Sequence, residues 1–198
     1  MIEILRKRQK LIFVIFVFLI FTISLLTFWR ALSFDFWGED WEQIWFVVFN
    51  PSMINHQYET WPHPIVIYEE LFLAKFLGSN PFYWQIVGYL LKVLGALAVS
   101  LMMLGITRSR RAAFFTGLIF ASSVGGLGSV TWMAAHASAL VIPFLCLGIY
   151  FWIIRKYYVL ALALLLFSIW SDPARGILGS FLVILWDSLS FVQHTNKD

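Results

Sequence analysis

Long runs of apolar residues, separated by short polar segments, dominate the pattern of this chain. A helix needs about 20 residues to cross a hydrocarbon core of about 30 Å, because it rises about 1.5 Å per residue. Residues 11–32 and 82–104 reach this length with at most two basic residues each, and residues 112–154 contain no Asp, Glu, Lys or Arg. The last run is long enough for two crossings. The pattern therefore predicts a polytopic, all-α membrane protein.

The later runs are divided by residues that weaken helices. Three glycines in 125–129 favour a turn, which predicts spans over 112–129 and 133–154. Two shorter runs follow at 158–171 and 177–192, with Pro173 and Gly176 in the segment between them. We therefore expect about six transmembrane helices in a single domain covering 1–198.

The remaining segment, 33–81, is the one long connection between spans and is expected to carry interfacial helices.

The first run is longer than the 7–15 residues of a secretory signal core, and it ends in Thr27-Phe28-Trp29-Arg30 rather than in small residues. It is therefore interpreted as a retained membrane anchor.

Composition supports a lipid environment. The chain of 198 residues is 61% hydrophobic and 13% charged, whereas soluble domains are about 45–50% apolar and about 25% charged. A net charge of +3 would suggest nucleic acid in a soluble protein, but here the basic residues lie in short clusters between apolar runs. We expect the lipid bilayer as a partner and no nucleic acid. The single cysteine, Cys146, excludes an intrachain disulfide.

The distribution of charge predicts the orientation. Cytoplasmic loops carry the excess of Lys and Arg, and with a cytoplasmic N-terminus ten of the fourteen basic residues fall inside and eight of the eleven acidic residues fall outside. This predicts an integral protein of the plasma membrane with both termini in the cytoplasm and the 33–81 loop outside. The inside residues are Arg6, Lys7, Arg8, Lys10, Arg108, Arg110, Arg111, Arg155, Lys156 and Lys197.

The densest acidic cluster, residues 35–42, directly follows the first span. One interpretation is an interfacial helix, because Trp37, Trp41 and Trp45 recur at helical spacing and tryptophan favours the headgroup layer. The other is a catalytic carboxylate or a ligand of a divalent cation, carried by Glu39 or Asp40. Adjacent side chains on a helix point about 100° apart, so these two cannot both face one reacting atom.

Other polar residues near the expected membrane boundary also have two interpretations. His136 is either a satisfied interfacial histidine or a contact for a phosphate or sugar hydroxyl. Asp172 and Arg175 either cap and pair at a helix junction or provide a cation for a phosphate. Lys92 lies near the middle of its span, too deep for easy snorkelling, so we expect a helix partner or an internal polar cavity. No dense ligand spacing supports a metal site, although His56 and His63 are seven residues apart.

Several motifs occur in the order found in integral-membrane glycosyltransferases of the GT-C type. They are Glu39-Asp40-Trp41 after the first span, Thr60-Trp61-Pro62-His63-Pro64-Ile65, Leu77-Gly78-Ser79-Asn80-Pro81, Val130-Thr131-Trp132-Met133-Ala134-Ala135-His136, and Trp170-Ser171-Asp172-Pro173. Over residues 10–190 the chain thus resembles the amino-terminal part of this family.

The resemblance implies transfer of a sugar, with inversion, from a polyprenyl-phosphate donor to an acceptor on the extracytoplasmic face. It implies Asp40, and after it Glu39, as the catalytic base, and it suggests that Asp35, His63, His136, Asp172 and Arg175 bind substrate. It also implies that a carboxy-terminal half or a partner subunit supplies further donor contacts. The alternative from a different class is a non-enzymatic membrane protein, such as a transporter subunit or scaffold.

Overall fold

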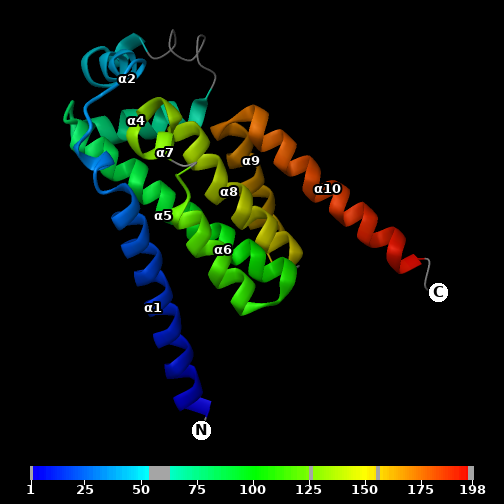
Figure 1. The fold of residues 1–198 in the computed structure, drawn as a ribbon. Coiled ribbons are helices and arrows are strands. Elements are labelled where there is room, and N and C mark those ends of the chain that lie inside the picture. The colour runs from blue at the N-terminus through cyan, green and yellow to red at the C-terminus, as the bar shows by residue number, and fades with distance from the viewer. Residues whose placement is uncertain (1, 54–62, 125–126, 155–156, 196–198) are drawn as a thin grey trace.

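The computed structural model describes residues 2–53, 63–124, 127–154 and 157–195, and every regular element in these ranges is helical (Figure 1). The helices of eight or more residues are α1 (Ile2–Phe28), α4 (Pro64–Leu77), α5 (Pro81–Thr107), α6 (Arg110–Ser122), α8 (His136–Ile153), α9 (Tyr158–Ser171) and α10 (Pro173–Thr195). The shorter ones are η1 (Ala31–Ser33), α2 (Asp40–Ile44), η2 (Trp45–Phe49), η3 (Pro51–Met53), α7 (Leu127–Thr131) and η5 (Met133–Ala135). The predicted all-α fold is confirmed.

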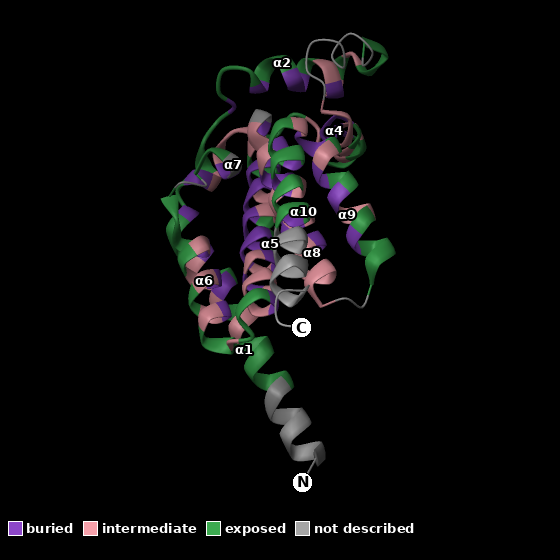
Figure 2. Cartoon of the chain, turned by 90° about the vertical axis from the view of Figure 1, so that its right-hand side faces the viewer, coloured by how far each residue is buried: buried purple, intermediate pink, exposed green. Residues whose placement is uncertain are grey.

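Helix α5 forms the centre of the bundle. It packs against α1, α6 and α8, and α9 covers the other side of α8, with α10 beside α9 (Figures 1 and 2). Small residues permit these close approaches: a β-carbon on Gly148 would lie 2.9 Å from the Leu165 side chain, and one on Gly179 would lie 2.3 Å from Leu145. Such contacts are how helices pack tightly in lipid, where burial of apolar surface gives little driving force.

Three helical stretches of the described chain are long and apolar enough to cross a membrane: Lys10–Phe28, Pro81–Thr107 and His136–Ile153. Tyr158–Ser171 and Pro173–Leu185 are shorter apolar helices. Large apolar side chains cover their outer surfaces, including Leu26, 70% exposed, and Val159, 84% exposed. Exposed apolar surface on helices of this kind is typical of contact with lipid. The chain is thus compatible with an integral membrane protein.

The helix expected over 112–129 is shorter than the sequence pattern suggested. Helix α6 has 13 residues and ends at Ser122, because Ser123 takes an extended backbone, and α7 begins separately at Leu127. Thirteen residues span about 20 Å, less than the hydrocarbon core. The first helix also ends earlier than expected, at Phe28 instead of residue 32, and Ala31–Ser33 forms a 3-10 turn. The described helices therefore do not establish six crossings.

The described parts of the long connection, residues 33–53 and 63–81, form a helical cap over one end of the bundle (Figure 1). Ile44 and Val47 from α2 and η2 pack with Ala74 of α4 and Trp84 of α5 in one buried apolar cluster. The three tryptophans of the predicted interfacial stripe, in contrast, are each more than half exposed: Trp37, Trp41 and Trp45. They therefore lie largely outside the buried core, although Trp37 contacts the Trp132 ring and Trp41 the Phe36 ring. His56 and the motif residues Thr60-Trp61-Pro62 lie outside the described residues.

Candidate functional site

Four polar side chains meet under the helical cap: Asp40 at the start of α2, Glu69 and Glu70 on α4, and His136 at the start of α8. We refer to them as the carboxylate–histidine cluster. Asp40 and Glu70 have no exposed surface and His136 is 1% exposed. Because three separate segments contribute, the cluster exists only in the folded chain.

Local backbone structure directs Asp40 into the protein. Gly38 has a φ of 57°, a conformation that favours glycine. The turn that it forms allows the Trp37 N–H to donate to Oδ2 of Asp40 at 3.2 Å. Glu39 is exposed on the opposite side. The two members of the acidic pair therefore do not face one point, as two ligands of one cation would.

Helix α4 places Glu70 on its apolar face. Val66 and Ile67 lie four and three residues before Glu70, and Ala74 lies four residues after it. Residues at these spacings share one side of a helix. All four are buried. Glu69 lies on the flank of this face, with its side chain 20% exposed. Pro64 at the first helical position is compatible with this helix start.

Burial and neighbouring charge act together on Glu70. Desolvation raises the pKa of Glu70 well above its ordinary value of 4.5, and the carboxylates of Glu69 and Asp40 raise it further. Oε2 of Glu69 lies 3.8 Å from Nδ1 of His136, which makes an ion pair when the imidazole is protonated. The His136 ring in turn lies 6.4 Å from the Trp84 ring, centre to centre. The cluster thus combines a carboxyl group of raised pKa, that of Glu70, with two further carboxyl groups and an imidazole.

Several buried polar atoms of this region have no hydrogen-bond partner among the described residues. They are both carboxyl oxygens of Glu70, Oε2 of Glu69, Nδ1 of His136 and Oε1 of Gln43, which follows Asp40 by three residues on α2. Buried polar groups are usually paired, and unpaired ones concentrate where a protein binds or reacts with a ligand. Side chains that hold and exchange protons in such a setting are suited to general acid–base chemistry.

A second polar group lies near the beginning of α4. Nδ1 of His63 lies 2.9 Å from the carbonyl oxygen of Ser171, which links the cap to the end of α9. Asp172 follows, and its Oδ1 accepts from the Arg175 N–H at 3.2 Å while its Oδ2 pairs with the Arg175 guanidinium. This is the geometry of a helix cap with an adjoining ion pair.

The structure brings together only part of the site predicted from sequence. Asp40 and His136 meet in the cluster. His63 caps the start of α4 and contacts Ser171, which precedes Asp172 at the junction of α9 and α10. The Arg175 side chain is 62% exposed. Asp35 is exposed, and its Oδ1 accepts from the Phe36 N–H at 2.8 Å.

Glu69 and Glu70 were missed as site residues, although the spacing of Glu70 from the apolar residues of its helix was a usable signal of burial. No group of three or more His, Cys, Asp and Glu side chains in the described part of the chain is arranged to hold a metal ion.

No protein-family model, curated protein or solved structure matches this chain. Its function is therefore inferred from its own residues.

Proposed function

We propose that this protein is a membrane glycosyltransferase of the GT-C type, transferring a sugar from a polyprenyl-phosphate donor to an acceptor hydroxyl on the extracytoplasmic face. The observation that carries the proposal is the carboxylate–histidine cluster, with its unpaired buried polar atoms, under the cap formed by the first long loop. The resemblance of the ordered motifs supplies the reaction type.

In the proposed reaction Asp40 is the base. Its carboxylate takes the proton of the acceptor hydroxyl while the acceptor oxygen attacks the anomeric carbon from the side opposite the phosphate. The bond between the anomeric carbon and the phosphate oxygen breaks, and polyprenyl phosphate leaves with the electron pair. A positioned base of this kind contributes about 10²- to 10⁴-fold to a rate.

Glu70 and Glu69 have supporting tasks. A protonated Glu70 leaves Asp40 as the charged member of the adjacent pair, because two neighbouring carboxylates in an apolar site do not both ionise readily. Glu69 orients His136 through their 3.8 Å contact. Since Asp40 has no exposed surface, the proposal requires a movement of the cap that admits the acceptor.

The proposed topology has about six spans, with α6, α9 and α10 completing the set begun by the three long helices. Both termini lie in the cytoplasm and the cap lies outside the plasma membrane. The support is the distribution of Lys and Arg between the loops. In this orientation the cluster faces the compartment in which polyprenyl-phosphate sugars are consumed by this type of enzyme.

The test uses the purified full chain in proteoliposomes that contain polyprenyl-phosphate glucose or polyprenyl-phosphate mannose, each labelled in the sugar, together with a membrane extract that supplies acceptor hydroxyls. We expect transfer of label from at least one donor to an acceptor, and Asp40→Asn should lower it by about 10²-fold or more. Glu42→Gln, an exposed acidic neighbour on the same helix, is the matched control and should retain the rate. Equal turnover by Asp40→Asn and wild type would contradict the assignment of Asp40 as base.

The competing function, a non-enzymatic subunit or scaffold, predicts a different result. Neither donor would then be consumed, and Asp40→Asn would change only stability, because the hydrogen bond from Trp37 to Asp40 holds the turn of the cap.

A further inference from the structure

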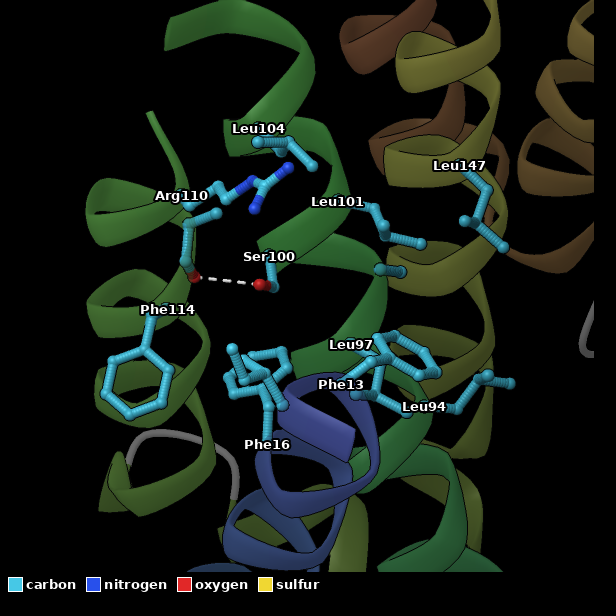
Figure 3. Close-up of a pocket in the computed structure, with 13 residues that line it drawn as sticks. Phe13, Phe16, Leu94, Leu97, Ser100, Leu101, Leu104, Arg110, Phe114 and Leu147 are labelled. Atoms are coloured by element: carbon cyan, nitrogen blue, oxygen red, sulfur yellow. Dashed lines mark hydrogen bonds between the residues drawn. The ribbon is translucent and has the colours of Figure 1, made fainter. Parts of the chain in front are cut away.

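A cavity of about 510 Å³ lies at the end of the bundle opposite the carboxylate–histidine cluster (Figure 3). The middle of α1, the second half of α5 and the beginning of α6 form its walls, and Leu147 of α8 also lines it. Its volume is within the range of about 300–1,000 Å³ that is usual for sites of small ligands. It shares no residue with the cluster and is independent of the function proposed above.

The walls are apolar along most of their length. Phe13 and Phe16 of α1 face Leu97 and Leu101 of α5 across the space (Figure 3). The hydroxyl of Ser100 donates to the carbonyl oxygen of Ala113 at 2.7 Å, so it is already engaged within the wall. The cavity therefore suits a hydrocarbon chain and not a polar ligand.

One end of the cavity is cationic. Among the described residues that line it, Arg110 alone is charged, and its guanidinium lies beside Leu104, above Ser100 (Figure 3). Arg108 and Arg111 adjoin it in the sequence and are exposed. Residues 71–171, which include α5, α6 and α8, contain no Asp or Glu. These three helices thus offer no carboxylate to neutralise the arginines.

We propose that this cavity is a binding site for an anionic phospholipid, with an acyl chain between α1, α5 and α6 and the phosphate on Arg110. The walls from α1, α5 and α8 belong to helices that are long and apolar enough to cross a membrane, so lipid acyl chains are the expected surroundings. Guanidinium groups bind phosphate oxygens through two parallel hydrogen bonds. The positive charge of Arg110 is complementary to an anionic headgroup and not to a zwitterionic one.

The test is native mass spectrometry of the full chain in mild detergent, mixed with phosphatidylglycerol or with phosphatidylcholine of the same acyl chains. We expect one phosphatidylglycerol to be retained in preference to phosphatidylcholine. Arg110→Gln should lower the retention of phosphatidylglycerol about fivefold, the amount that one basic residue near an anionic lipid contributes. Arg111→Gln removes a neighbouring charge that does not line the cavity. This variant should retain phosphatidylglycerol as the wild type does.

A second pair of variants tests the hydrocarbon part. Leu101→Trp fills the cavity and should lower retention of both lipids, whereas Ile106→Trp, on the same helix but outside the cavity and 42% exposed, should not. Glycerol phosphate, which has the headgroup chemistry without a chain, should not displace the lipid.

Three results would overturn the proposal: equal retention of the two lipids by the wild type, equal effects of the two arginine variants, or displacement by glycerol phosphate. Should Arg110→Gln fail to fold, the two tryptophan variants decide, and equal lipid retention by both would overturn the site.

Discussion

The ammonium nitrogen of Lys92 lies 4.1 Å from the centre of the Phe120 ring and 5.7 Å from that of the Phe28 ring. Lys92 is 4% exposed and sits in the middle of α5. The partners of this buried cation are thus aromatic faces on α6 and α1. Such faces attract cations through the ring quadrupole, which accounts for the position of the lysine inside the bundle.

This relationship predicts coupling between Lys92 and Phe120. Phe120→Leu should destabilise the wild type more than it destabilises Lys92→Met, by about 1–2 kcal/mol, because a desolvated cation–π contact contributes about this amount. The measurement is a double-mutant cycle of unfolding in detergent micelles. Phe115→Leu, at a 60% exposed position of the same helix, should show no coupling to Lys92. Additive effects at Phe120 would refute the interaction.

The raised pKa of Glu70 predicts a pH-dependent stability. An acid whose pKa is raised in the folded state stabilises the fold below its ordinary pKa, here 4.5, and loses this contribution as the pH rises through the folded value. The free energy of unfolding of the wild type should therefore fall as the pH rises from the ordinary pKa to the folded-state pKa of Glu70. The expected decrease is about 1.4 kcal/mol for each pH unit in this interval.

Glu70→Gln isolates this effect because the amide keeps the shape and does not ionise. We expect its stability to vary less with pH and to exceed that of the wild type at neutral pH. Thermal unfolding in detergent from pH 4 upward measures the pH dependence and the stability at neutral pH. The control is Glu42→Gln, which replaces an exposed carboxylate of the cap. Parallel pH profiles for wild type and Glu70→Gln would argue against a neutral Glu70.

The junction of α9 and α10 predicts unequal roles for Asp172 and Arg175. Asp172 precedes Pro173 and accepts the Arg175 N–H at 3.2 Å, as a helix cap does, so Asp172→Ala should cost about 1 kcal/mol. Arg175→Gln should cost less, because its side chain is 62% exposed and exposed ion pairs contribute little. Asp172→Asn keeps an acceptor and should retain most of the stability. Equal losses for Asp172→Ala and Asp172→Asn would place the effect in the charge instead of the cap.

The proposed orientation predicts where substituted cysteines react. Ser52→Cys in the cap should react with a membrane-impermeant maleimide in intact cells, and Thr107→Cys at the end of α5 should react only after permeabilisation. Both native side chains are exposed, and the native Cys146 is buried, so the background should be low. The reverse labelling pattern would place the cap in the cytoplasm.

The all-helical membrane class could be read from the chain alone. A long, mainly apolar run such as residues 82–104 has few stable alternatives to a helix in lipid, because every backbone N–H and C=O must be satisfied within the segment. The shared side of Trp41 and Trp45 likewise follows a local rule, since residues four apart lie on one side of a helix. Both features depend on neighbours in sequence.

The composition of the site depended on the tertiary structure. Helical spacing indicates that Glu70 shares a face with Val66 and Ala74, but it does not indicate that Asp40 and His136 cover that face. Such pairings arise from the packing of distant elements, as when Gly148 admits Leu165. The aromatic partners of Lys92 lie 28 or more residues away in the sequence. Sequence spacing could not predict them, because they too depend on the packing of distant helices. A periodic pattern reports the face that a residue occupies, whereas only the packed chain decides what lies against it.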